Sequence, residues 1–478
     1  MLIRNSLLYM VARLVPGLFG MATTALLTRV LDVAGYGIYG LVLVIMTFVS
    51  TMGFDWLGVS FLRFYDGKEG GERTIATFAY IFLALVLLSA GLTGIAGAFG
   101  AFSGSQAPIY VLGIVLAWSY SWFELAARLE TASLRPMRYL FMNLGRAALI
   151  LAAAVGAAWI THDPVWTAVG TGVGMFGGAL MGSMRGRYLA PGLFDRALAL
   201  KVLAFGFPLA VSLTLNGLIG SGTRALVQAL GSAEDLGFYT AAFILVQNTL
   251  VIMAVGVASA SFPLAVRAVE SGDAARAQRQ LLANGSLLLA VIAPACLGMA
   301  LTADGVASTL VGHKFTPTVA LLTPWMAAAA FFAGLRAHYL DHAFQLGRRP
   351  SLQVWVTVVA AILAIGLSIY LIPRYGPVGA AMAVTVAMVA SCVHATIAGR
   401  LAYPLPLPLG AALRVLGACL FMALMVEAVP GRGAVVFMLQ VSVGVLAYAA
   451  AGFALNVVDL RSRAMPFILR WARRVPSA

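Results

Sequence analysis

Four charged side chains interrupt long apolar stretches in the first part of the sequence: Arg13, Asp55, Glu124 and Arg146. A planar guanidinium can hydrogen-bond two phosphate oxygens at once, so Arg13 and Arg146 are candidate ligands for a diphosphate. Asp55 and Glu124 are candidates for ion coupling, or for ion pairs of Arg13 with Asp55 and of Glu124 with Arg146. Both interpretations hold together if the acids keep the arginines in place until a substrate arrives.

A second set of polar residues lies later in the chain. Arg224 stands at the end of an apolar stretch and is a third candidate phosphate ligand. His338, Asp341 and His342 have helical spacing, which puts them on one helix face. A proton relay is one interpretation, since histidine titrates near neutral pH. We favour a solvated segment at the end of a membrane span, because the basic stretch 347–350 follows at once. A metal site would need further ligands, so we expect none.

Motifs of common catalytic and nucleotide-binding sites are absent from the sequence. It contains no H-E-x-x-H, no G-x-S-x-G and no G-x-x-x-x-G-K-[ST]. Residues 172–177 fit G-x-G-x-x-G, but they lie inside an apolar stretch with no preceding strand. Glycines recur every four residues from Gly170 to Gly182, which favours a smooth stripe for helix packing. We therefore expect neither an enzyme nor a cofactor.

The composition sets the class of protein that must position these residues. The 478 residues are 62% hydrophobic and 10% charged, with a mean hydropathy of +0.95. An average soluble domain is roughly 45–50% apolar and about 25% charged. These values exclude an ordinary soluble enzyme and a disordered chain. Long apolar blocks, in place of alternating residues, also exclude an outer-membrane barrel. The sequence predicts an all-α, polytopic membrane protein.

About fourteen apolar blocks have the length of roughly 20 residues that a membrane-spanning helix needs. They cover residues 6–28, 37–62, 74–101, 108–128, 139–160, 165–184, 202–223, 237–263, 281–303, 318–340, 351–372, 377–398, 409–428 and 433–456. The loops between them are short and leave no room for a soluble domain.

The basic residues predict the orientation. The net charge is +14, but the basic residues come in twos and threes between apolar blocks, which argues against nucleic acid as a partner. Twenty-two of the 31 lysines and arginines fall on the side of the two termini, and five on the other. The positive-inside rule then places both termini in the cytoplasm. The tail, Asp459 to Arg474, has the pattern of a basic amphipathic segment on anionic lipid.

Two stretches are alike, and their Gly-x-Tyr pairs, which begin at Gly37 and Gly237, stand 200 residues apart. A Thr-Arg pair ends one span and Gly-x-Tyr opens the next, at residues 28–39 and again at 223–239. We interpret this as a parallel duplication. It predicts two six-helix lobes, 1–190 and 191–400, with two extra C-terminal helices and the basic tail in 401–478.

Four motifs occur in one order along the chain. The most specific is the turn at 372–381, with the pattern Pro-x-Tyr-Gly-x-x-Gly-Ala-Ala; the others lie at 206–208, 237–242 and 310–315. Together they resemble the O-antigen and capsule flippases of the multidrug/oligosaccharidyl-lipid/polysaccharide exporter superfamily. The resemblance implies two lobes around a cationic central cavity, alternating access, and export of a lipid-linked sugar. The chain departs from the family at Thr223, where an acidic residue is common.

Several functions stay open. The first is a flippase that moves a polyprenyl-diphosphate-linked oligosaccharide across the bacterial inner (plasma) membrane for polysaccharide or lipopolysaccharide export, alongside a polymerase and export machinery. The alternatives are a multidrug or organic-cation antiporter on the same fold, and a flippase for the peptidoglycan precursor. A cation antiporter would favour acidic residues in its cavity, whereas here arginines accompany the few embedded acids. The expected partners are therefore the lipid-linked oligosaccharide and the bilayer.

Overall fold

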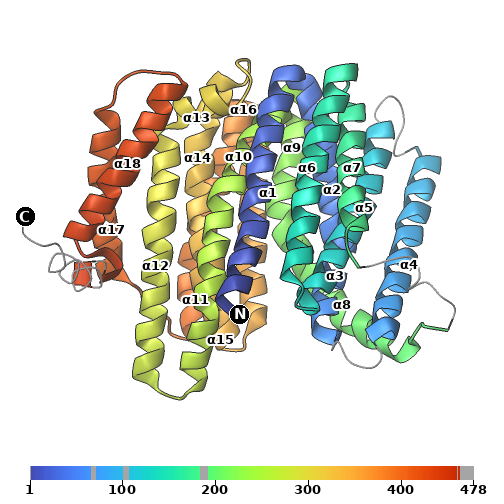
Figure 1. Ribbon diagram of the computed structural model, residues 1–478, viewed down its shortest axis with the longest axis horizontal. Helices are drawn as coiled ribbons and strands as arrows, with labels where there is room; N and C mark the ends of the chain where they lie inside the picture. The colour runs from blue at the N-terminus through green and yellow to red at the C-terminus, as the bar shows by residue number, and fades with distance from the viewer. Residues whose placement is uncertain (1, 66–70, 101–106, 184–191, 460, 463–478) are drawn as a thin grey trace, which may run out of the picture. The chain divides into compact units, whose positions relative to one another are not determined.

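The computed structural model describes residues 2–65, 71–100, 107–183, 192–459 and 461–462, with side chains from residue 12 onward except 13, 14 and 260. Nearly all of these residues are helical, and these ranges contain no strand (Figure 1). The predicted all-α class is confirmed.

The helices form two compact units. The N-terminal unit comprises residues 1–244 and 361–380, and the C-terminal unit comprises residues 245–360 and 381–478. In chain order, the N-terminal unit contains α1 (Leu2–Val30), α2 (Val33–Gly53), α3 (Asp55–Phe64), α4 (Gly71–Ala98), α5 (Ala107–Ala132), α6 (Pro136–Thr161), α7 (Pro164–Leu180), α8 (Arg196–Gly217), η2 (Leu218–Gly222), α9 (Thr223–Leu230) and most of α10 (Ala233–Val246). The C-terminal unit contains η3 (Gln247–Val251), α11 (Ile252–Glu270), α12 (Ala274–Leu301), α13 (Ala303–Leu310), α14 (Thr316–Leu335), η4 (Arg336–Leu340), α15 (His342–Leu346), α17 (Leu409–Glu427), α18 (Ala434–Ala454) and η5 (Val457–Asp459). The helix α16 (Pro350–Ala402) contributes to both units.

Eleven helical segments in the described part are long and apolar enough to cross a membrane. One of them, α16, has 53 residues, or about 80 Å of helix, which exceeds twice the hydrocarbon thickness of a bilayer. Its helical geometry is interrupted at Gly376, whose φ of 57° favours glycine. This is the turn of the most specific sequence motif. In the described ranges, each of the fourteen predicted spans lies mostly on helix. The exact count of fourteen crossings stays a prediction.

Several acidic residues serve helix ends, which accounts for carboxylates outside the spans. Asp32, Asp163, Asp195 and Asp273 each precede a helix and accept a hydrogen bond from a backbone N–H of its first turn. A side-chain oxygen at this position satisfies an N–H that has no partner within the helix. These four carboxylates stabilise α2, α7, α8 and α12.

The starts of α2 and α10 support the internal repeat. A Cβ atom at Gly37 would overlap the carbonyl oxygen of Ala233, and a Cβ atom at Gly237 would overlap that of Val33. The two contacts are equivalent under the 200-residue offset, and such reciprocity is what a two-fold relation produces. The close approach requires glycine at both positions. The lobe boundaries near residues 190 and 400 stay predictions, and the basic tail lies almost entirely outside the described residues.

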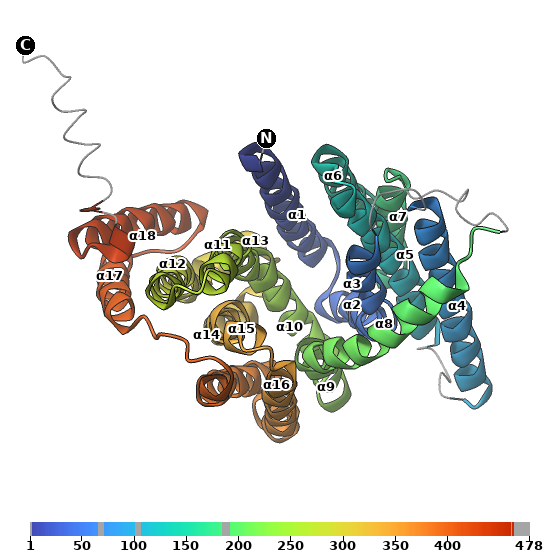
Figure 2. The same ribbon diagram turned by 90° about the horizontal axis from the view of Figure 1, so that it is seen from below.

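The last two helices pack on α12 in the C-terminal unit (Figure 2). The hydroxyl of Tyr448 donates to the carbonyl oxygen of Ala290 at 2.8 Å, and Val415 and Cys419 are buried against Leu289. Leucines on the outer faces of α17 and α18 are exposed, as expected for helices in contact with lipid. This agrees with the predicted extra pair.

Candidate functional site

A cavity of about 180 Å³ lies in the N-terminal unit beside the junction of α2 and α3. The sequence predicted one continuous span over 37–62, but the helix is broken at Phe54, where φ is −130° and ψ is −31°. The break makes Asp55 the first residue of α3. A carboxylate is stabilised at a helix N-terminus by the helix dipole. The chain thereby holds an acidic side chain at the wall of the cavity.

Two serines fix the carboxylate of Asp55. The hydroxyl of Ser50 donates to Oδ1 of Asp55 at 3.0 Å, and the Ser50 and Ser121 hydroxyls lie 2.8 Å apart. Ser50 is fully buried and Ser121 nearly so. The hydrogen-bonded chain therefore links α2, α3 and α5 at the cavity.

The cavity also exposes an ion pair on α5. Nη2 of Arg128 lies 3.7 Å from Oε2 of Glu124, four residues earlier, and both side chains are partly exposed. Arg128 lies along α3 at Gly58, where a Cβ atom would stand 3.4 Å from its Cγ. The absence of a side chain at Gly58 therefore gives the long arginine room beside the cavity.

Arg146 of α6 belongs to the same group. Its guanidinium lies 4.4 Å from the ring centroid of Phe123, and its Nε atom is buried with no hydrogen-bond partner among the residues that the structure describes. The Tyr120 hydroxyl interacts electrostatically with all four charged residues. We call Asp55, Tyr120, Glu124, Arg128 and Arg146 the N-terminal charge cluster. The predicted pairing of Glu124 with Arg146 is wrong, because Arg128, one turn along α5, takes that place.

The other two candidate phosphate ligands are not part of the described cluster. The side chain of Arg13 lies outside the described residues, so its pairing with Asp55 stays a prediction. Arg224 is buried, donates to the Gly220 carbonyl and to Ser221, and lies over the ring of Phe243 at 4.5 Å. It stands about 16 Å of helix beyond Leu213, which lines the cavity. Local contacts thus satisfy Arg224 in this conformation.

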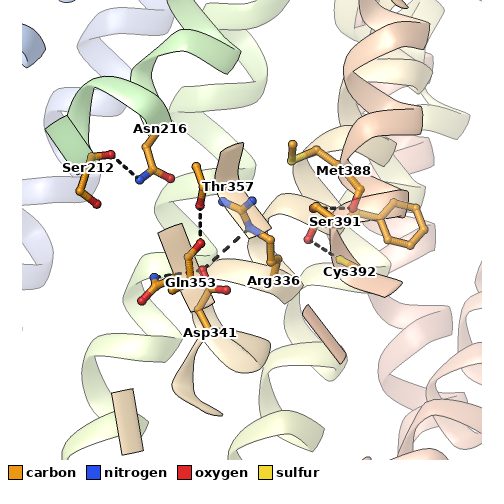
Figure 3. Close-up of polar contacts among 10 residues, drawn as sticks. Ser212, Asn216, Arg336, Asp341, Gln353, Thr357, Met388, Ser391 and Cys392 are labelled. Atoms are coloured by element: carbon orange, nitrogen blue, oxygen red, sulfur yellow. Dashed lines mark hydrogen bonds and ion pairs between the residues drawn. The ribbon is translucent and has the colours of Figure 1, made fainter. Parts of the chain in front are cut away.

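A second cluster lies in the C-terminal unit. Nε of Arg336 is 3.8 Å from Oδ2 of Asp341, and the amide of Gln353 donates to the same oxygen at 3.3 Å (Figure 3). Arg336, Asp341 and His342 are each more than nine-tenths buried. Within the described ranges, no hydrogen-bond partner is present for Nε and Nη1 of Arg336, Oδ1 of Asp341 and Nδ1 of His342. We call Arg336, Asp341, His342 and Gln353 the C-terminal buried cluster.

The favoured interpretation of this segment as solvated is wrong. The π-helical turn η4 directs the N–H of Asp341 to the carbonyl of Arg336, five residues earlier, at 2.8 Å. The extra residue per turn changes the faces that helical spacing predicts, and π turns are frequent at functional sites. His342 stacks on Phe262 with centroids 4.1 Å apart, while His338 is only half-buried. Packing against α11 and α16 therefore covers Asp341 and His342.

The family model for polysaccharide biosynthesis proteins matches residues 2–269, more than half of the chain. The chain belongs to this family. No curated protein matches it significantly. In this chain, the N-terminal charge cluster and its cavity lie inside the matched segment. The C-terminal buried cluster lies outside it.

Solved structures show the fold. The chain is similar to lipid II flippase MurJ in an inward closed conformation, with 14% identity, a TM-score of 0.76, and coverage of 94% of this chain and 99% of that one. It is also similar to an inward-facing multidrug resistance MATE transporter of the MOP superfamily, with 12% identity, a TM-score of 0.61, and coverage of 83% and 94%. An outward-facing MATE structure gives 14% identity, a TM-score of 0.54, and coverage of 84% and 94%. This family member therefore has the fold of known transporters and flippases.

Sequence reasoning missed several residues of both clusters. Arg128 is not among the predicted site residues, although its four-residue spacing from Glu124 is a signal for an ion pair. Tyr120 and Gln353 carry no charge, so nothing in the sequence singled them out. No group of three histidines, cysteines or carboxylates in the described ranges is placed to hold a metal ion.

Proposed function

We propose that this polysaccharide biosynthesis family member is a flippase for a polyprenyl-diphosphate-linked oligosaccharide in the bacterial inner membrane. The observation that carries the proposal is the pairing of Arg128 with Glu124 at the cavity, with Arg146 on the neighbouring helix, whose Nε has no partner among the described residues. Arg128 lines the cavity, and Arg146 packs on Phe123 of the same helix, α5. A diphosphate needs charge-assisted donors to replace its hydration, and two guanidiniums supply them.

In this proposal the substrate exchanges partners within the N-terminal charge cluster. Arg128 leaves Glu124 and binds a phosphate oxygen, and Nε of Arg146 donates to the same diphosphate. Diphosphate and sugars cannot cross about 30 Å of hydrocarbon unaided, while the polyprenyl chain can stay in the bilayer. Asp55 and Glu124 hold the arginines between cycles. Arg13 and Arg224 remain candidates for contacts in other conformations, with alternating access between lobes.

The same proposal includes the residues that would couple transport to an ion gradient and the proteins that would use the transported unit. Asp55, Glu124, His338 and Asp341 are candidates for ion coupling, because an embedded carboxylate or imidazole is costly unless it has a partner or a role. A polysaccharide polymerase and export machinery would consume the translocated unit on the outer side. Both termini are expected in the cytoplasm, from the distribution of basic residues.

A second candidate function is export of an organic cation. The observation that favours it is the wall of the cavity, where two carboxylates, Asp55 and Glu124, face one arginine, Arg128. The ion pair of Glu124 with Arg128 leaves Asp55 as the remaining carboxylate. In this function the cation would bind at Asp55, and Glu124 would become a second carboxylate ligand once it separates from Arg128.

Lipid-linked sugars from a deletion strain distinguish the two functions. We expect a complete repeat unit on its polyprenyl diphosphate to accumulate in the inner leaflet, and a plasmid copy of the chain to clear it. Unchanged glycolipids together with altered tolerance to organic cations would support the antiporter and contradict the flippase.

A further inference from the structure

Two arginines converge on one hydroxyl group at the end of the helix pair α6–α7. Nη1 of Arg135 donates to Oγ of Ser183 at 3.1 Å, and Nη1 of Arg138 donates to the same oxygen. Both guanidiniums are exposed. Each has five N–H donors, so these contacts leave most donors of both side chains for a ligand.

A buried carboxylate, Glu130, is part of the same site. Oε1 of Glu130 accepts the backbone N–H of Ser183 at 2.7 Å, and Glu130 is fully buried. Among the described residues, no carboxylate lies within ion-pair distance of Arg135 or Arg138. Two like charges held at one point repel each other. The group of Arg135, Arg138 and Glu130 has a formal charge of +1, and its positive members face outward.

The surface beside this point is apolar. Met137 and Phe141 of α6 are 49% and 61% exposed, and Leu180 at the end of α7 is 66% exposed. On a helix that lies in a bilayer, such side chains contact acyl chains. The arrangement therefore has an anion-binding end and a hydrocarbon-facing side, which match the two parts of a phospholipid.

We propose that Arg135, Arg138 and Ser183 bind the phosphate of an anionic phospholipid, with its acyl chains along Phe141 and Leu180. The charge complementarity and the adjoining apolar surface favour a membrane lipid over a free phosphate. Basic pockets between spanning helices on the cytoplasmic side are known to hold anionic headgroups. The site lies in a different place from the cavity and does not depend on the proposed transport.

Native mass spectrometry of the full-length protein, titrated with phosphatidylglycerol or phosphatidylcholine, tests the proposal. We expect tighter binding of one phosphatidylglycerol molecule than of phosphatidylcholine. The double variant Arg135→Gln/Arg138→Gln should lose this preference, with affinity roughly tenfold weaker for each arginine removed. The matched control is Arg348→Gln/Arg349→Gln, which removes two exposed, adjacent charges on the same expected side and should keep the bound lipid.

Further variants keep the test decisive. If the double variant does not fold, the single variants Arg135→Gln and Arg138→Gln replace it in the test. Each should show an intermediate loss of affinity for phosphatidylglycerol. Replacement of both arginines by lysine should retain part of the affinity, because the charge stays and the two-donor fork is lost. Equal lipid binding by the double variant and the wild type would overturn the proposal, and so would an equal loss in the control. Displacement of the lipid by millimolar pyrophosphate would assign the arginines to a free phosphate ligand instead.

Discussion

The N-terminal charge cluster and the C-terminal buried cluster each pair an arginine with a carboxylate, but their surroundings differ. Arg128 and Glu124 lie 3.7 Å apart at an open cavity, with 37% and 30% of their side chains exposed. Arg336 and Asp341 lie 3.8 Å apart with 8% and 6% exposed, and four polar atoms of their cluster have no hydrogen-bond partner in the described part of the chain. Nearly the same distance thus joins an accessible pair and a sealed pair.

This difference separates two roles for embedded charges. An accessible pair loses little when its partners separate, so an incoming phosphate can take the place of the carboxylate. A sealed pair leaves an uncompensated charge in a medium of low dielectric when one partner goes. The N-terminal charge cluster is therefore suited to exchange ligands. The C-terminal buried cluster is suited to hold η4 and the start of α16 in one arrangement.

The largest effect is expected from Asp341→Asn. The change keeps the shape of the side chain but leaves the buried charge of Arg336 unpaired, at a cost of about 3–5 kcal/mol. Thermal unfolding of the purified protein in detergent measures it. Replacing both Arg336 and Asp341 by leucine should recover most of the loss. Unchanged stability of the single variant would mean that the pair is not sealed.

Arg146→Ala should reduce export of the lipid-linked sugar strongly while the protein stays in the membrane. The change removes a charge-assisted hydrogen bond of about 1.5–3 kcal/mol, or roughly tenfold to a hundredfold in rate. The amount of surface polysaccharide at equal protein level is the measurement. Arg146→Lys should restore only part of it. Full export by the alanine variant would remove Arg146 from the substrate site.

His342→Phe tests whether the C-terminal buried cluster is structural. The phenyl ring can keep the stacking on Phe262 and removes an Nδ1 atom that has no partner among the described residues, so we expect stability within about 1 kcal/mol of the wild type. Unfolding temperature and export should both stay close to normal. Loss of export at normal stability would instead point to ion coupling through this histidine.

Glu124→Gln should have the smallest effect on stability. Because the pair with Arg128 is partly exposed, its removal is expected to cost at most about 1 kcal/mol. The same unfolding measurement applies, with Asp341→Asn as its matched counterpart. A loss as large as that of Asp341→Asn would erase the distinction between the two clusters.

Composition and apolar block length were sufficient to predict the all-α class and the helices that carry each candidate residue. The turn at Gly376 was also predictable, because its φ of 57° demands the glycine that the motif provides. The break at Phe54 was not predicted, because the apolar stretch continues through it, although Gly53 and Asp55 on either side are residue types found at a helix end and a helix start. The π turn at Arg336–Leu340 likewise changed which polar side chains meet, and no spacing rule for an α-helix foresees it.

Binding of a polyprenyl-diphosphate sugar to purified Glu124→Gln, compared with the wild type, tests the central claim most directly. If Glu124 holds Arg128 until a diphosphate arrives, its neutralisation frees the guanidinium and should tighten diphosphate binding, while Arg128→Ala should weaken it. Native mass spectrometry or a lipid-displacement titration can report both. Weaker diphosphate binding by Glu124→Gln, or no change with Arg128→Ala, would contradict the assignment of this cluster to the substrate.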